Sequence, residues 1–187
     1  MFAVVGLGNP GARYARTRHN VGFRVVDRVR SGFRGAQAVP FGRDCELVRV
    51  RAAEDEVLLV KPLAWMNLSG PVVARVVQEH GLTPGDLLVV SDDVNLPLGK
   101  LRLRLGGGPG GHNGLASIVD SLGSEDFPRL RVGVGAEGLE GDLTDFVLGP
   151  FEPQEEEAAE VAVVRAADAV MSYLRFGPGK AMNDFNR

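Results

Sequence analysis

A polar loop that follows the first apolar run is the strongest candidate for chemistry. Residues 6–20 form this loop, directly after the apolar residues 2–5. The loop carries His19, one of only three histidines in the chain, together with Asn9 and Asn20. Loops that follow the strands of an α/β sheet hold much of the chemistry of such proteins. A histidine oriented by a carboxylate is a common general base at neutral pH, so His19 requires an acid nearby.

Two adjacent acids, Asp92 and Asp93, provide that partner. They end a second apolar run, residues 86–91, which predicts a buried central strand. Because the carboxyl ends of parallel strands share one edge of a sheet, we expect these acids to lie near His19. No serine or cysteine stands out as a nucleophile, since Ser69 is predicted to cap a helix and Cys45 lies in a different strand. The pattern therefore favours an activated water over a covalent intermediate.

Three asparagines lie in predicted loops and have two interpretations. Asn9, Asn67 and Asn113 can shape turns and helix ends, or they can orient a substrate and stabilise an oxyanion. The glycine-rich loop of residues 106–111 would let a ligand approach the backbone closely, although flexibility alone also explains it.

Basic residues alternate with leucines just before that loop. Lys100, Arg102 and Arg104 share one face of a predicted strand, and Arg129 and Arg131 lie on another strand. They form either a solvated sheet edge or a contact surface for the phosphates of a partner.

Gly6-x-Gly8-x-x-Gly11 has the form of a dinucleotide fingerprint, which gives a rival interpretation. Pro10 stands where a helix should start, and residues 12–18 have no apolar helical stripe. A nicotinamide-dependent oxidoreductase is therefore the weaker alternative. A second rival is an RNA-binding module without catalysis, against which the presence of both His19 and Asp92 argues.

Composition limits the possible classes. The chain has 187 residues with 44% hydrophobic residues and a formal net charge of -3, so nucleic-acid affinity has to come from a local patch. No run approaches about 18 apolar residues, which argues against a membrane span. The single cysteine cannot form an internal disulfide and fits a reducing cytoplasm.

The hydrophobic patterns predict a single α/β domain, with one mixed sheet covered by helices. Strands are expected at 2–6, 45–51, 57–61, 86–91, 100–105 and 130–134, with a turn at 54–56 and a short last strand at 145–148. Helices are expected after the caps Asn20, Ser69 and Asn113, and from Pro153 onward.

Several motifs together carry a family resemblance. They are Val5-Gly6-Leu7-Gly8-Asn9-Pro10-Gly11 with Tyr14, Thr17-Arg18-His19-Asn20-Val21-Gly22, Met66-Asn67-Leu68-Ser69-Gly70, Asp92-Asp93, Leu96-Pro97-x-Gly99, Gly110-Gly111-His112-Asn113-Gly114, Arg129-Leu130-Arg131-Val132-Gly133 and Phe146-Val147-Leu148-Gly149. This combination spans nearly the whole chain and resembles the bacterial-type peptidyl-tRNA hydrolases. The resemblance implies one domain over residues 1–187, with a twisted mixed sheet flanked by helices. It also implies a cytoplasmic monomer, without a metal or other cofactor, that cleaves the ester between a peptide and the terminal ribose of tRNA.

The resemblance also assigns roles. It makes His19 the general base and Asp92 its partner. It makes six residues substrate-binding: Asn9, Tyr14, Met66, Asn67, His112 and Asn113. It assigns tRNA phosphate binding to Arg104 and Arg131. Asn95 departs from the pattern, because relatives commonly carry an acid there, so this chain has no third acid at that position.

Overall fold

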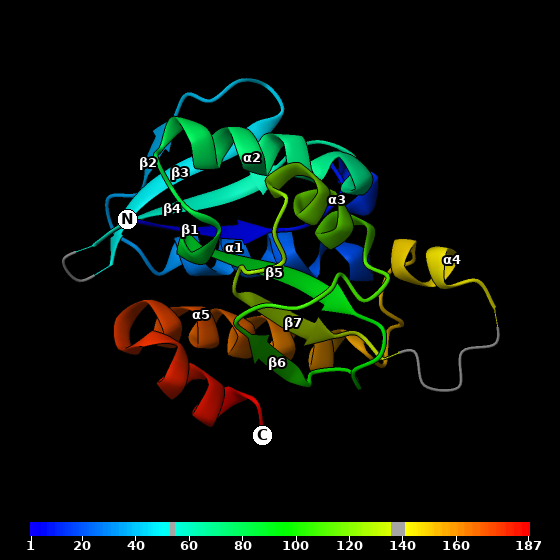
Figure 1. Cartoon of the computed structure of the whole chain (residues 1–187). Helices are drawn as coiled ribbons and strands as arrows, with labels where there is room; N and C mark the ends of the chain where they lie inside the picture. Colours follow the sequence, from blue (N-terminus) through cyan, green and yellow to red (C-terminus); the bar gives the residue numbers. More distant parts are fainter. Residues whose placement is uncertain (53–54, 136–140) are drawn as a thin grey trace.

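The computed structural model describes residues 1–52, 55–135 and 141–187. In this part of the chain, seven strands form one mixed sheet with the order β2-β3-β4-β1-β5-β7-β6 (Figure 1). The strands are β1 (Phe2–Gly6), β2 (Gln37–Val39), β3 (Cys45–Ala52), β4 (Asp55–Pro62), β5 (Leu87–Asp93), β6 (Leu101–Arg104) and β7 (Arg129–Gly133). The central strands β4, β1, β5 and β7 run parallel to one another, whereas β2, β3 and β6 pair in antiparallel fashion.

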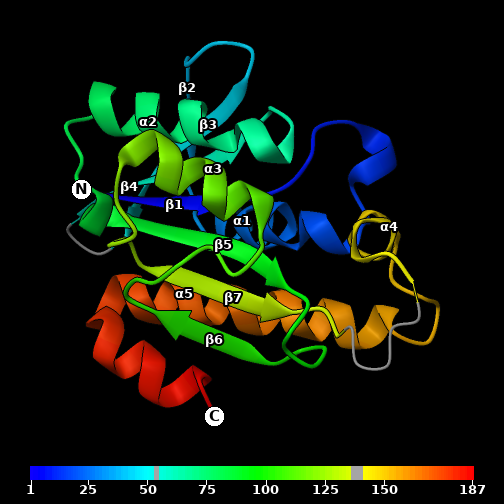
Figure 2. The ribbon, with the colours of Figure 1, turned by 45° about the vertical axis from the view of Figure 1, so that its right-hand side comes forward.

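Helices cover both faces of the sheet, as Figures 1 and 2 show. The longer helices are α1 (Val21–Ser31), α2 (Ser69–Glu79), α3 (Asn113–Leu122) and α5 (Glu156–Phe185), and a short helix α4 (Leu143–Leu148) lies apart at one end. Side chains alternate along each strand. Val4 therefore packs with the α1 and α5 residues, while Ala3 and Val5 pack with those of α2 and α3. The predicted α/β domain with a mixed sheet between helices is confirmed.

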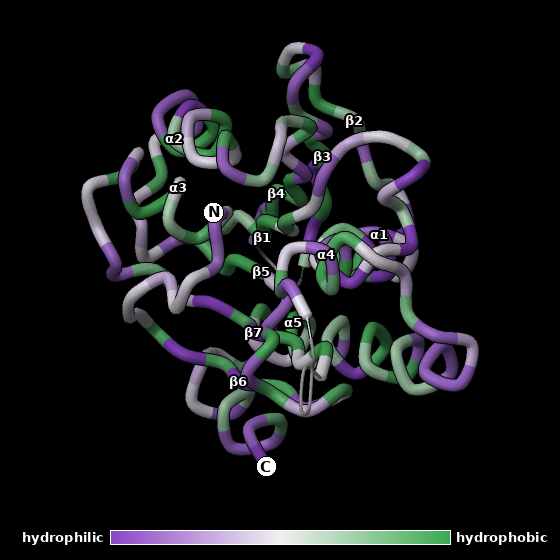
Figure 3. The backbone as a smooth tube through the Cα atoms, turned by 90° about the vertical axis from the view of Figure 1, so that its right-hand side faces the viewer, coloured by the Kyte–Doolittle hydropathy of each residue, from purple (hydrophilic) through white to green (hydrophobic). Residues whose placement is uncertain are grey.

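Figure 3 views the molecule from the end of the sheet where α4 lies. The tube is green, and therefore apolar, along much of the central strands β1, β4 and β5. Polar segments lie mostly toward the outside. Among the described residues, no helix is long and apolar enough to cross a membrane.

Several local predictions need correction, and one is the start of the last helix, since α5 begins at Glu156 and not at Pro153. Residues 145–148 belong to helix α4, because the Asp142 carboxylate accepts hydrogen bonds from the backbone N–H groups of Thr144 and Asp145 and starts a helix there. Ser69 is the first residue of α2, and Leu68 occupies the N-cap position. The hairpin of β3 and β4 forms as expected, but Asp55 and Glu56 of the predicted turn lie in β4, and Glu54 lies outside the described residues.

The end of α5 is bent back onto the sheet. Gly177 has a φ of 81°, which breaks the helical geometry directly before Pro178, and the chain turns there. This turn brings Asn186 to the edge strand β6. Its side-chain amide accepts a hydrogen bond from the Leu103 N–H at 2.6 Å and donates one to the Leu103 carbonyl at 3.1 Å.

Candidate active site

The loop after β1 is held against helix α1 by glycine contacts. A Cβ at Gly8 would lie 2.7 Å from the Phe23 ring, and a Cβ at Gly22 would lie 2.5 Å from both the Leu7 nitrogen and the Val90 carbonyl oxygen. These glycines therefore permit close packing of the loop on α1. The chain beyond Gly11 forms a short 3₁₀ turn, Ala12–Tyr14, instead of the α-helix that a dinucleotide site requires. The rival interpretation as a dinucleotide-binding protein loses its structural basis.

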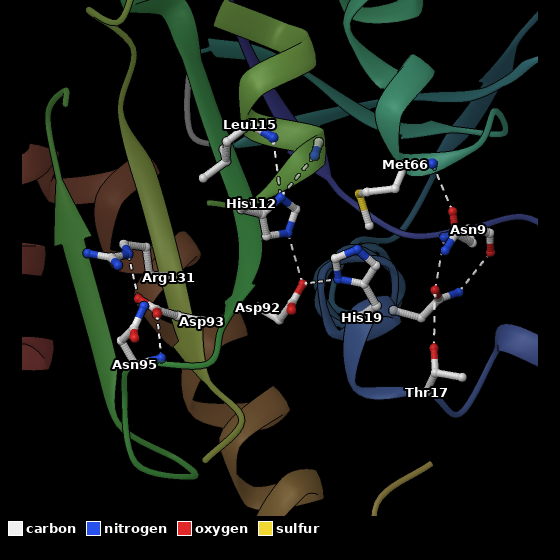
Figure 4. A network of polar contacts seen from close by, with 12 residues as sticks. Asn9, Thr17, His19, Met66, Asp92, Asp93, Asn95, His112, Leu115 and Arg131 are labelled. Atoms are coloured by element: carbon white, nitrogen blue, oxygen red, sulfur yellow. Dashed lines mark hydrogen bonds and ion pairs between the residues drawn. The ribbon is translucent and has the colours of Figure 1, made fainter. Parts of the chain in front are cut away.

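His19 and Asp92 meet as the sequence predicts. His19 lies in a second 3₁₀ turn, η2 (Arg18–Asn20), directly before α1, and Asp92 lies near the end of β5. The Nδ1 atom of His19 is 2.8 Å from Oδ1 of Asp92. Both side chains are buried. A carboxylate only accepts hydrogen bonds, so Nδ1 of His19 carries a hydrogen, and in the neutral ring the lone pair is on Nε2. Figure 4 shows this second nitrogen turned toward the side of His112 and Met66.

A second histidine lies on the same carboxylate oxygen. Nε2 of His112 is 2.9 Å from Oδ1 of Asp92, and the rings of His112 and His19 have centroids 4.9 Å apart (Figure 4). Burial by itself would raise the pKa of the Asp92 carboxyl. The two histidines outweigh that effect and hold its pKa well below the ordinary range. Asp92 is therefore a carboxylate, which is the state needed to orient His19.

Asn9 is fixed by a network of amides. Asn20 accepts from the Asn9 backbone N–H and donates to the Asn9 carbonyl, both at 2.9 Å, so its side chain serves the loop although the residue stands at the N-cap position of α1. The Oδ1 atom of Asn9 accepts from the Met66 N–H at 2.8 Å. Since this oxygen is used by the backbone, Asn9 offers its amide nitrogen, a donor, to the cleft.

A cleft of about 720 Å³ collects most of the predicted site residues. Its lining includes the predicted residues Asn9, His19, Met66, Asn67, Asp92, His112, Asn113 and Arg131. Met66 and Asn67 lie in the 3₁₀ turn η3 (Met66–Leu68), and Asn113 is the first residue of α3. Tyr14 and Arg104 are not in the lining.

Tyr14 packs against Trp65, a cleft residue that the sequence analysis did not identify. Trp65, half exposed, lines the cleft, and Tyr14 packs edge-on against it with ring centroids 5.8 Å apart. A lone tryptophan directly before Met66-Asn67 was the available signal.

On the other side of the cleft, Arg131 and Asp93 form an ion pair. Nε of Arg131 lies 2.5 Å from Oδ2 of Asp93, and the Asn95 backbone N–H donates to Oδ1 of Asp93 at 2.9 Å. Arg104 lies exposed on β6, on the same sheet face as Arg131. Arg129, grouped with these in the sequence, is instead buried. It donates to the carbonyls of Gly108 and Glu125 and so anchors the glycine-rich loop.

Helix α4 forms one wall of the cleft, and this wall was not predicted. Leu143, Thr144, Val147 and Leu148 contribute to the lining. Arg18, next to His19, holds the chain that follows α4. Its guanidinium lies over the Phe146 ring, 4.2 Å from the centroid, and pairs with Glu155 at 2.5 Å.

Three of these residues could together hold a metal ion: His19, Asp92 and His112. Each offers one ligand atom, and these atoms lie within 4.8 Å of one another. In the structure, one nitrogen of each ring, Nδ1 of His19 and Nε2 of His112, forms a hydrogen bond to Asp92. The absence of a metal stays a prediction. Cys45 lies buried in β3, and burial raises the pKa of its thiol to about 12, so it is no ready nucleophile.

Comparison with known proteins identifies the class. A family model described as peptidyl-tRNA hydrolase matches residues 3–187. The peptidyl-tRNA hydrolase of Chloroflexus aurantiacus is 46% identical over 187 residues, which cover 100% of this chain and 99% of the relative, and that of Aquifex aeolicus is 42% identical over 185 residues, 98% and 95% of the two chains. The crystal structure of the peptidyl-tRNA hydrolase from Acinetobacter baumannii superposes with a TM-score of 0.91 at 33% identity, covering 100% of this chain and 94% of that one. The protein is therefore a hydrolase with an α/β fold. It belongs to the peptidyl-tRNA hydrolase family.

Proposed function

We propose that this protein hydrolyses the ester bond between a peptide, or an N-blocked aminoacyl group, and the terminal ribose of tRNA. The observation that carries the proposal is the buried pair of His19 and Asp92, which opens on the same cleft as the Asn9 amide. Family membership supports the substrate class.

His19 acts as the general base in this mechanism. Its Nε2 takes a proton from a water molecule as the water oxygen attacks the ester carbonyl, and a tetrahedral oxyanion forms. Collapse of this intermediate breaks the bond between the carbonyl carbon and the ribose oxygen, and the proton passes to that oxygen. A positioned general base contributes about 10²–10⁴-fold to such a reaction. Asp92 fixes the tautomer of His19 and stabilises the imidazolium that forms.

Amide groups serve the carbonyl and the substrate. Asn9 offers a preoriented donor, because its oxygen is bound to the Met66 N–H. Asn67 and Asn113 line the same cleft and are assigned to orienting substrate and water or stabilising the oxyanion. Tyr14 and Met66 complete the proposed substrate-binding set, to which the family resemblance adds His112.

Arg104 and Arg131 are proposed to bind tRNA phosphates. Both lie on the sheet face that carries Lys100 and Arg102, and this face is continuous with the cleft through Arg131. The net charge of -3 makes such a local patch necessary for RNA binding. A monomeric domain over residues 1–187, cytoplasmic and without a cofactor, completes the proposal.

The decisive experiment compares two substrates. N-acetyl-aminoacyl-tRNA and the unblocked aminoacyl-tRNA are incubated with the wild-type chain and with His19→Ala. We expect release of free tRNA from the blocked substrate by the wild type and a loss of about 10²–10⁴-fold in the variant, which should remain folded. The control is His80→Ala, since His80 ends α2 and stacks on Phe41 away from the cleft lining.

Two outcomes would replace the proposal. Binding of tRNA without turnover by the wild type would favour an RNA-binding module. Thermal stabilisation by a nicotinamide dinucleotide, in the absence of ester cleavage, would revive the oxidoreductase alternative. Near-normal turnover by His19→Ala would remove the general-base assignment while leaving the substrate class intact.

A further inference from the structure

Both ring nitrogens of His112 are used within the protein. The Nδ1 atom lies 3.1 Å from the Gly114 backbone nitrogen and 3.2 Å from that of Leu115, so the ring forms the N-cap of α3. The Nε2 atom lies 2.9 Å from Oδ1 of Asp92. All three bonds appear in Figure 4.

These contacts determine the tautomer of His112. Backbone N–H groups only donate, so Nδ1 has to be the acceptor and carries no hydrogen. The carboxylate only accepts, so Nε2 has to carry the hydrogen. The ring is therefore neutral and is the opposite tautomer to His19. A hydrogen on Nδ1 would point at two amide hydrogens of the helix terminus.

We propose that His112 is a positioning residue that fixes Asp92, and through Asp92 the base His19, and that it does not act by contacting the substrate. The inference rests on the proposed function of the His19 and Asp92 pair. It departs from the substrate-binding role that the family resemblance gives His112.

The geometry explains what this link does. Oδ1 of Asp92 lies between two imidazole N–H groups, one from each histidine, so its carboxylate cannot rotate without breaking a bond. The far side of His112 is tied to the start of a ten-residue helix, whose first N–H groups carry partial positive charge. The ring thus connects a rigid element to the catalytic carboxylate. Both of its ring nitrogens are bonded within the protein, so neither is left to form a hydrogen bond with a substrate.

The neighbouring residue supports this division of roles. Asparagine is a favoured N-cap residue, and Asn113 was expected to cap α3. The cap made by His112 lets Asn113 stand in the first turn, where its exposed side chain lines the cleft.

The tautomers can be measured directly in the wild-type chain without substrate. Nitrogen-15 NMR of the imidazole rings at pH 7.5 has only three histidines to resolve, and His80→Gln identifies the third signal set. We expect hydrogen on Nε2 of His112 and on Nδ1 of His19. Hydrogen on Nδ1 of His112, or on both of its nitrogens, would overturn the proposal.

Two variants separate the cap from the bond to Asp92. His112→Asn places an acceptor near the Nδ1 position but is too short to reach Asp92, whereas His112→Gln places an amide donor near the Nε2 position and gives up the cap. For His112→Asn we expect kcat to fall about tenfold, the scale of one hydrogen bond to a charged group, with KM for N-blocked aminoacyl-tRNA nearly unchanged and the Tm retained. His112→Gln should recover most of kcat and lower the Tm by about 2–4 °C.

If His112 contacted the substrate directly, His112→Asn would raise KM and leave kcat nearly unchanged. A raised KM with kcat spared in His112→Asn, or no recovery of kcat in His112→Gln, would overturn the positioning role. If the wild type fails to cleave the ester, the proposed function falls, and the NMR measurement still decides the tautomer of His112.

Discussion

Two adjacent carboxylates at the end of β5 have neighbours of opposite kinds. Asp92 lies between the rings of His19 and His112, whereas Asp93 pairs with the guanidinium of Arg131 (Figure 4). Successive residues of a strand point in opposite directions, so one strand end serves two sides of the cleft. The two histidines act through the positions of their ring hydrogens, whereas the guanidinium of Arg131 acts as a fixed positive charge. Under the proposed function, proton transfer by His19 and phosphate binding by the arginines can therefore be changed separately.

The largest expected effect comes from breaking the histidine side. Asp92→Asn removes the negative charge that stabilises the imidazolium of His19, although the amide oxygen can still accept hydrogen bonds from both rings. We expect kcat for N-blocked aminoacyl-tRNA to fall at least about 10²-fold, with KM changed much less. Steady-state kinetics measure this, with circular dichroism as the test of folding. A folded variant with wild-type kcat would show that Asp92 does not orient the base.

Arg104→Ala removes an exposed positive charge from the sheet face that also carries Arg131. The loss of one charge-assisted phosphate contact should raise KM about tenfold with kcat nearly spared. It should also lower the slope of log affinity against log salt by about 1. The matched control is Arg28→Ala, an exposed arginine on α1 that lies away from the cleft lining. Equal KM values for the two variants across salt concentrations would reject a phosphate role for Arg104.

Asp93→Asn should have a smaller effect on the same side. The amide oxygen can still accept from the Asn95 backbone N–H, but the pairing with Arg131 loses its charge. We expect KM to rise about threefold and kcat to stay within about twofold of wild type. Comparing this effect on KM with the effect of Asp92→Asn on kcat tests whether the two carboxylates have separate roles. A fall in kcat as large as that of Asp92→Asn would mean that the two carboxylates work as one unit.

The smallest expected difference concerns acid stability. The pKa of Asp92 is held below that of an unfolded aspartate, which is about 3.9. Its stabilising contribution is therefore fully present above that value and is lost as the pH falls through the lower native pKa. Urea unfolding at pH 7 and pH 3 should show a smaller loss of free energy of unfolding for Asp92→Asn than for the wild type. Equal losses would indicate that Asp92 is not held as a carboxylate by its neighbours.

The sequence predicted the meeting of His19 and Asp92, because strand ends and the loops after them are visible as hydrophobic patterns. It did not predict the role of His112 as a helix cap, since Asn113 is the commoner residue for that task. The helix at 143–148 was read as a strand because an apolar run this short has no clear period, and the cap at Asp142 decided the outcome.

Long-range packing accounts for the remaining differences. Arg129 and Arg131 share a strand face, but the chain around Gly108 and Glu125 covers only Arg129. The wall that α4 contributes to the cleft depends in the same way on contacts of Arg18 with residues more than 100 positions away. Such contacts leave no local pattern in the sequence.

The amide of Asn186 on the edge strand β6 has a consequence for self-association. An open sheet edge is a template on which another extended chain can add as a further strand. Asn186 occupies both backbone groups of Leu103, in the middle of β6, in the way that a neighbouring strand would. The Asn186 side chain thus blocks the addition of a further strand to β6, which carries Arg102 and Arg104. Loss of this single amide would leave a basic strand open to pairing with a second copy of the chain.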